Sequence, residues 1–402
     1  MTSTALHGAR RDISIMGLIG LAHGLSHFLQ LALPSMFLAI RADLGVSFAA
    51  LGMATTVFYV VSGLCQTAAG FAVDRFGAPR ILIAGLGLFA LGVGAMGLAP
   101  SFGVIVACAI VAGIGNSVFH PADFGILNAS ITPKRLGPAF SVHGISGNIG
   151  WALAPSAMAA FALWFGGWRG ALLAAAGVAF AALALVVARR DLFAAPPVAA
   201  GGRAGPAPGS PAVLLSMPIQ MCFLFFLLLA AGLIGVQNFG IPTLNQIHRF
   251  SPEAAAVALT TFLLASGAGV LCGGIVAARA TRHEHVAAAG MAAAAGFVAL
   301  VALAGLPAWA VLACLAAAGF ATGLTNPSRD MIVRAAAPPG STGKVYGFVY
   351  SGLDAGSALA PILFGMLLDR GAAAGVVFAI AVLWLVSIAT IYLMAHASRR
   401  RG

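Results

Sequence analysis

Charged side chains are scarce in this 402-residue sequence. Asp, Glu, Lys and Arg together make up 8% of the residues, and only 10 residues are Asp or Glu, whereas a soluble domain has roughly 25% charged residues. Hydrophobic residues make up 61% of the chain, and the mean hydropathy is +1.01. These values exclude a water-soluble fold, because so few polar groups could not cover its surface.

Other absences exclude further classes of protein. The five cysteines each stand alone in an apolar stretch, without the paired spacing of zinc sites or disulfide frameworks, so we expect small, reduced core residues. No Gly-rich phosphate loop ending in Gly-Lys-Ser/Thr occurs, which argues against direct ATP hydrolysis. The net charge of +11 comes from scattered basic residues rather than from a basic stripe with aromatics, so nucleic acid is not an expected partner. The cysteines are Cys65, Cys108, Cys222, Cys272 and Cys314.

Long apolar runs recur along the whole chain. Each run has about 20 residues or more, enough to cross a hydrocarbon core of roughly 30 Å. Backbone groups in lipid must be hydrogen-bonded within the segment, so these runs predict helices. The sequence therefore predicts an all-α membrane protein of twelve transmembrane helices. The predicted spans are 14–40, 48–72, 81–99, 102–127, 136–165, 169–188, 213–244, 254–278, 285–306, 308–333, 343–368 and 372–395.

Basic residues predict the orientation of these spans. With both termini in the cytoplasm, the inner segments hold 16 Lys and Arg residues and the outer segments hold four, as the positive-inside rule requires. The first apolar run has no small-residue cleavage site, so we expect a retained span and not a signal peptide. We therefore expect a multi-pass protein of a bacterial-type inner membrane, in contact with lipid.

The chain divides into two related halves. A Pro-, Gly- and Ala-rich stretch at 189–212 predicts a flexible cytoplasmic linker between six-helix bundles at 1–188 and 213–402. An offset of 206 residues lays His120-Pro121 on Asn326-Pro327 and continues without a gap through the following span. Parallel repeats of this kind are typical of carriers whose substrate binds between the two halves.

The segment between the second and third spans carries a charged turn motif. Gly70, Asp74, Arg75, Gly77 and Arg80 place a carboxylate, two basic residues and a turn glycine at a spacing that can brace two helix ends. Together with twelve spans, this motif resembles the cytoplasmic signature of the major facilitator superfamily of secondary carriers. The resemblance covers essentially the whole chain and implies two pseudo-symmetric bundles that work by alternating access.

Shorter segments narrow the resemblance and also depart from it. Residues 25–37 and 115–125 are similar to the branch that includes fosmidomycin-resistance exporters. In the charged motif, Ala78 and Pro79 stand where basic residues are common, and the second half has Ala278 in place of the Asp. The antiporter signature of the fifth span is met only at Gly150 and Pro155, so export by antiport is left open.

Polar residues within the first span share one helix face. His23, His27, Gln30 and Pro34 follow at i, i+4, i+7 and i+11, and intramembrane polar groups are functional candidates by default. His27 lies deeper than His23 and is the better candidate for substrate binding together with Gln30. The alternative is that these histidines only support helix packing through a hydrogen bond to a neighbour's backbone.

The fourth span repeats this geometry with Asn116, His120 and Asp123. We expect Asn116 to contact substrate, while His120, Asp123 and His143 of the next span form a proton-coupling cluster, because neighbouring imidazoles can tune a buried carboxylate. A permanent Asp123–His120 ion pair that only ties helices together is the alternative.

The second half offers a guanidinium at the position that matches Asp123. Arg329 can pair with Asp123 across the halves, pair with Asp330 or Asp354 in its own half, or anchor a carboxylate or phosphonate substrate through its planar fork. Asp354 is a second coupling candidate. Further predicted substrate contacts are Tyr350 and Asn238, the latter because it aligns with Gln30.

These residues predict secondary active transport of a small molecule by a carrier that needs no cofactor and works as a monomer. Efflux of a drug-like or anionic compound driven by protons or another coupling ion is the leading hypothesis, and proton-coupled uptake of an organic anion is its rival. A membrane enzyme is disfavoured, because no metal-ligand spacing or nucleophile accompanies the buried His and Asp residues. A transport-inactive receptor has only the degenerate second loop in its favour.

Overall fold

The computed structural model describes residues 3–132, 135–193, 214–336 and 342–399, and these residues form helices joined by short turns. Contacts divide the chain into an N-terminal unit, Met1–Val46 with Val57–Gly202, and a C-terminal unit, Ser47–Thr56 with Arg203–Gly402. The first residues of the second predicted span therefore group with the C-terminal unit. The predicted linker lies mostly at 194–213, outside the described residues, so that division of the chain stays a prediction.

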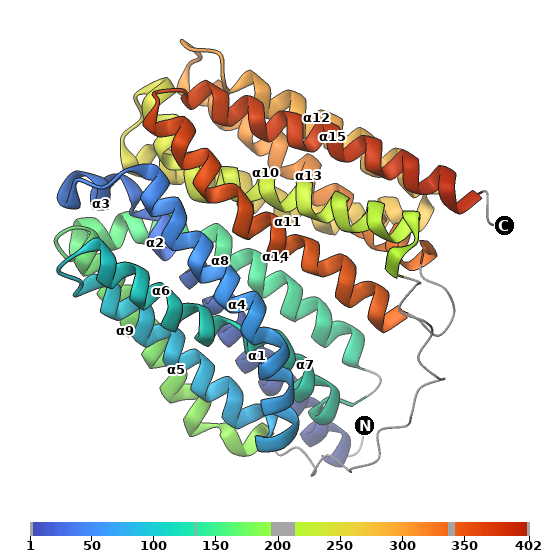
Figure 1. The fold of residues 1–402 in the computed structure, drawn as a ribbon. Helices are drawn as coiled ribbons and strands as arrows, with labels where there is room; N and C mark the ends of the chain where they lie inside the picture. Colours follow the sequence, from blue (N-terminus) through green and yellow to red (C-terminus); the bar gives the residue numbers. More distant parts are fainter. Residues whose placement is uncertain (1–2, 133–134, 194–213, 337–341, 400–402) are drawn as a thin grey trace. The chain divides into compact units, whose positions relative to one another are not determined.

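Helices of the N-terminal unit pack through contacts of α1 with α8 and of α5 with both α6 and α9. The helices are labelled in Figure 1. Their bounds are α1 Ser3–Gln30, α2 Ala32–Ser35, α3 Phe37–Leu44, α4 Phe48–Phe76, α5 Ala78–Gly97, α6 Phe102–Asn116, α7 Phe119–Ser130, α8 Leu136–Trp164 and α9 Trp168–Ala188, followed by the 3-10 turn η2 Arg190–Phe193.

Two predicted spans of this unit are broken, and a proline accounts for each break. The first span ends as α1 at Gln30 and continues through α2 and α3, because Pro34 has no N–H for the carbonyl four residues earlier. The fourth span divides into α6 and α7 at Ser117 and Val118. This break lies one turn before Pro121, which has no N–H to bond the carbonyl of Ser117.

Glycines let α1 and α8 approach closely. A Cβ added at Gly150 would lie 1.9 Å from the Gly24 carbonyl oxygen, and one added at Gly147 would lie 2.9 Å from His23 Nε2. Small residues at helix crossings allow this approach in membrane proteins. The pair α1 and α8 forms the scaffold on which the polar side chains of this unit are placed.

The C-terminal unit packs α11 against α13, and α10 against α14 and α15. A Cβ at Gly323 would lie 1.9 Å from the Ser266 carbonyl oxygen, so α11 and α13 also meet through glycine. The bounds are α10 Met217–His248, α11 Pro252–Arg279, α12 His283–Leu300, α13 Ala308–Ala336, α14 Thr342–Asp369 and α15 Ala373–Arg399.

Ten of the described helical segments are long and apolar enough to cross a membrane. Helices α8 and α12 occupy the fifth and ninth predicted spans but are not among the ten. Helix α8 carries His143 and Asn148, and α12 opens with His283, Glu284 and His285, which lowers the hydropathy of each.

Candidate functional site

A buried carboxylate lies at the centre of the N-terminal unit. Asp123 of α7 is 0% exposed, and its Oδ2 lies 3.1 Å from His143 Nε2 of α8 and 3.3 Å from His23 Nδ1 of α1. The contact with His143 has hydrogen-bond geometry. Three helices thus bring their titratable side chains to one point inside the bundle, as expected for Asp123 and His143.

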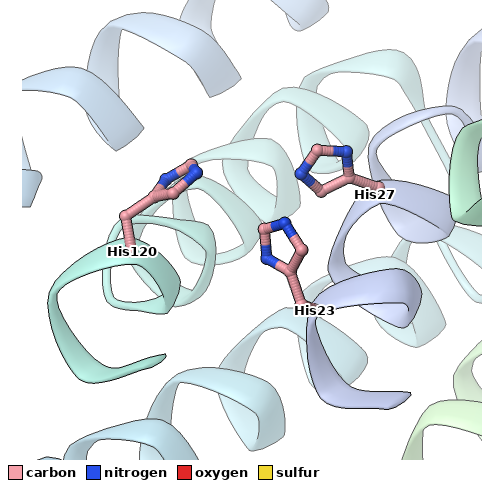
Figure 2. Close-up of side chains that lie close together, drawn as sticks. All are labelled: His23, His27 and His120. Carbon is pink, nitrogen blue, oxygen red and sulfur yellow. The ribbon is translucent and has the colours of Figure 1, made fainter. Parts of the chain in front are cut away.

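The imidazole rings around Asp123 form a continuous group. The ring of His23 stacks on His143 at 3.5 Å between centroids, and it lies 4.4 Å from His27 and 5.5 Å from His120. Figure 2 shows His23, His27 and His120 turned toward a common space. His23, which the sequence ranked behind His27, is therefore the ring that joins the others to the carboxylate.

A chain of polar side chains starts beside His27. Trp151 Nε1 donates to Gln30 Oε1 at 3.0 Å, and Gln30 Nε2 donates to Asn116 Oδ1 at 3.0 Å. Asn116 Nδ2 in turn donates to Ser62 Oγ at 2.8 Å. The predicted substrate residues Gln30 and Asn116 are in direct contact. Trp151, which packs on His27 with ring centroids 4.1 Å apart, connects them to the imidazole group.

Two sets of side chains in this group have the spacing of metal ligands. Ligand atoms of His23, His27 and His120 lie within 4.8 Å of one another, as do those of His23, Asp123 and His143. Neutral imidazole and carboxylate are common ligands of divalent transition metals. His23 and His27 are one helical turn apart in the sequence, but the other members of each set come from other helices, so neither set could be recognised from spacing alone.

Arg329 of the C-terminal unit contacts groups in its own half. Its Nε lies 3.1 Å from Asp330 Oδ1, its Nη1 donates to Asn326 Oδ1 at 3.3 Å, and its Cζ lies 4.6 Å from the centre of the Phe226 ring. Tyr350 donates its hydroxyl hydrogen to the same Asp330 oxygen at 3.1 Å. Among the alternatives for Arg329, the pairing with Asp330 is present.

Two other predicted residues of this unit have no partner among the described residues. Asn238, on α10, is only 1% exposed, and neither the nitrogen nor the oxygen of its side-chain amide has a hydrogen-bond partner among the described residues. Asp354, half-buried on α14, makes no ion pair or hydrogen bond with the described residues. Buried polar groups are nearly always satisfied in folded proteins, so unpartnered ones mark positions where a ligand or a proton can bind.

The charged turn motif lies at the junction of α4 and α5. Gly77, with φ +88°, is the single residue between the two helices, a backbone conformation that favours glycine. Gly70 faces open space, and Arg75 and Arg80 are exposed, with the Arg75 guanidinium 5.3 Å from the Phe76 ring centre. The side chain of Asp74 lies outside the described residues.

Two residues of these sites were not predicted from the sequence: Trp151 and Ser62. Trp151 lies eight residues after His143 on α8, a helical spacing that places both on one face, and this signal was available in the sequence. Ser62 gave none, because its role depends on a contact made in the folded chain.

Comparison with protein families identifies the architecture. The model described as Major Facilitator Superfamily matches residues 16–240 and 223–402, which is most of the chain. This chain belongs to the Major Facilitator Superfamily. It is accordingly a multi-pass membrane protein of a family of transporters, and the resemblance drawn from the turn motif is confirmed.

Curated relatives within the Major Facilitator Superfamily match part of the chain. The fosmidomycin resistance protein of Escherichia coli (strain K12) is 31% identical over 147 residues, which is 37% of this chain and 36% of the relative. The probable L-galactonate transporter of the same organism is 33% identical over 135 residues, 33% of this chain and 29% of the relative. These alignments span about a third of the relatives' length, so neither substrate transfers directly.

A solved structure shows the same fold. A bacterial homolog of the human lysosomal transporter Spinster superposes with a TM-score of 0.75 over 96% of this chain and 95% of that chain, at 15% identity. At this identity the likeness concerns the fold alone, and it confirms the predicted major facilitator architecture.

Proposed function

We propose that this Major Facilitator Superfamily protein exports a small drug-like or anionic molecule in exchange for protons, by alternating access. The fosmidomycin resistance protein supports the direction, because export of a compound provides resistance to it. The probable L-galactonate transporter supports the rival, proton-coupled uptake of an organic anion. We further propose a bacterial-type inner membrane, cytoplasmic termini and a monomeric carrier.

One observation carries the proposed proton coupling: the isolated carboxylate of Asp354. It lies within the membrane-spanning segment Phe348–Asp369, and the described residues provide it with no cationic partner. A charged side chain at the bilayer centre costs about 2.5 kcal/mol or more, and taking up a proton removes that charge. Asp354 is therefore the proposed proton carrier, rather than a structural partner of Arg329.

The N-terminal unit contributes a second charge to the proposed coupling. Asp123 is fully buried, and its described contacts are to histidines and not to Lys or Arg. A carboxylate held in this way needs a cation for charge balance. We assign His120 and His143 to the coupling machinery with Asp123, as groups that compensate this charge when the carrier changes state.

Neutral and basic groups in both units provide the proposed substrate contacts. In the N-terminal unit these are His27, Gln30 and Asn116, and in the C-terminal unit they are Asn238, Arg329 and Tyr350. The unpartnered amide of Asn238 supports this role most directly. Arg329 provides a positive charge that would favour an anionic group, and the stacked Phe226 ring beside it would favour an apolar one.

Transport by the purified protein in liposomes tests this proposal. With fosmidomycin as the first probe, an imposed pH gradient should drive fosmidomycin movement opposite to proton movement. Asp354→Asn should abolish the response to the gradient while retaining exchange of labelled for unlabelled compound, which moves no net protons. The control Asp191→Asn, an exposed residue of η2, should behave as wild type. Uptake in the direction of the proton gradient would reject efflux, and gradient-driven transport by Asp354→Asn would reject the proton carrier.

A further inference from the structure

Histidines from two helices of the N-terminal unit meet in the arrangement of a metal site. His23 and His27 lie one turn apart on α1, and their ligand atoms and that of His120 from α7 lie within 4.8 Å of one another. Histidines at i and i+4 of a helix present both rings to one ion, as in helical zinc motifs. Figure 2 shows the ring of His120 facing this pair from the neighbouring helix.

Nitrogen atoms of this cluster are buried without a hydrogen bond. Nδ1 of His27 has no hydrogen-bond partner among the described residues, and because the residue is only 9% exposed, bulk water does not readily replace one. Neutral imidazoles are the form that binds metal, so the unpartnered nitrogen of His27 has a lone pair available for an ion.

Asp123 is placed to orient His23. The carboxylate Oδ2 lies 3.3 Å from His23 Nδ1, without the geometry of a hydrogen bond, and the other oxygen, Oδ1, has no partner. In metal sites a carboxylate beside one ring nitrogen orients the imidazole so that the other nitrogen can bind the ion, and Asp123 lies on that side of His23. The free nitrogen of His23 is Nε2.

Gly147 of α8 provides room for these rings. A Cβ at this position would lie 2.9 Å from His23 Nε2 and 3.1 Å from His27 Nδ1. Nε2 of His23 and Nδ1 of His27 therefore face the same stretch of α8, where a side chain is missing. His120 is exposed, whereas His23 and His27 are buried.

We propose that His23, His27 and His120 bind a divalent transition-metal ion of the zinc class, with Asp123 as a positioning residue for His23. Imidazole ligands suit Zn²⁺, Ni²⁺ and Cu²⁺, and the negative charge of Asp123 offsets part of the ion's charge. Three protein ligands leave a coordination position open, which is typical of zinc sites that exchange a ligand and not of purely structural ones. The site shares His27 and His120 with the substrate and coupling groups proposed above for the N-terminal unit, and it does not involve the proposed proton carrier Asp354.

Zinc binding to the full-length chain tests this assignment. The protein is purified in detergent with an affinity tag that contains no histidine, dialysed against Zn²⁺, and its zinc content and thermal stability are measured. We expect one Zn²⁺ per chain and a raised Tm. His27→Gln and His120→Gln should each weaken binding by about ten-fold or more. The matched control is His285→Gln, which removes an exposed histidine of α12 that contacts Arg282 and Tyr392, and it should bind Zn²⁺ as wild type does.

Gly147→Ala provides a second variant that keeps every histidine. Its methyl group enters the space beside His23 and His27, so it should also weaken Zn²⁺ binding, while Gly144→Ala on the same helix meets nothing within 4 Å and should not. Absence of bound Zn²⁺, or equal binding by wild type and the His27→Gln and Gly147→Ala proteins, would overturn the metal site. The proposed efflux is measured separately by transport, so either proposal can fail while the other holds.

Discussion

The close approach of α1 and α8 makes Gly150→Ala a severe change for one methyl group. Its Cβ would lie 1.9 Å from the Gly24 carbonyl oxygen, whereas a carbon and a carbonyl oxygen in contact are about 3.3 Å apart. The obstacle is backbone and not a flexible side chain, so the helices must move apart by about 1.4 Å, the difference between these distances. We expect a loss of about 1–3 kcal/mol of stability, the usual range for overpacking.

The displacement should also disturb the imidazole group. His23 is on α1 and His143 is on α8, and their rings stack at 3.5 Å between centroids. Helices moved apart by about 1.4 Å cannot keep this contact without new side-chain rotamers. Gly150→Ala should therefore weaken Zn²⁺ binding as well as lower the Tm.

Three alanine substitutions on α8 form a graded assay. Thermal unfolding in detergent, followed by tryptophan fluorescence, should give a wild-type Tm for Gly144→Ala, a lowered Tm for Gly147→Ala and the lowest Tm for Gly150→Ala. The order follows the obstacles, which are open space, imidazole rings and backbone. Equal Tm values for Gly150→Ala and Gly144→Ala would refute the close contact of α1 with α8.

Three further changes follow from contacts outside this crossing. Hydrogen bonds from Arg169 and the neighbouring indole hold the pKa of Asp43, on the exposed last turn of α3, below its usual value. The contact therefore stabilises the fold above the unfolded pKa and is lost as pH falls through the lowered folded pKa, so Asp43→Asn should lower the Tm at pH 7 and lose this effect as the solution is acidified. Trp151→Phe removes the donor to the half-buried Gln30, which should cost about 1 kcal/mol in thermal unfolding, the usual net value of one hydrogen bond. Asp369 accepts two hydrogen bonds of 2.8 Å from the first N–H groups of α4. Asp369→Ala removes this helix cap and should cost about 1 kcal/mol of stability. An unchanged Tm would show that water satisfies these N–H groups equally well.

Sequence reasoning located the helices well because apolar run length decides where a chain can cross lipid. The interruption of the fourth span also has a local cause, because Pro121 has no N–H for the carbonyl of Ser117, where the helix breaks. Features that depend on one helix alone, such as its length and its breaks, could be predicted from the sequence. What the sequence could not provide was the neighbour of each side chain.

The ranking of the histidines shows this limit. His27 was preferred to His23 because it lies deeper in the first span, and depth is a property of one helix. The contact of His23 with Asp123 and His143 depends on how α1, α7 and α8 pack, and helix periodicity leaves the rotation of each helix against its neighbours undetermined. Asp330, which holds Arg329 in the structure, was one of several partners that the sequence allowed.

An indole N–H can donate but never accept, so the direction of every hydrogen bond in the series that begins at Trp151 is fixed. Gln30 must present its oxygen to the indole and its NH₂ to Asn116, and Asn116 must do the same toward Ser62. The hydroxyl of Ser62 then has its oxygen engaged and its hydrogen free to point elsewhere. A substrate group placed beside Ser62 would therefore meet a hydrogen-bond donor. The indole of Trp151, three side chains away, would in this way favour substrates with an exposed acceptor.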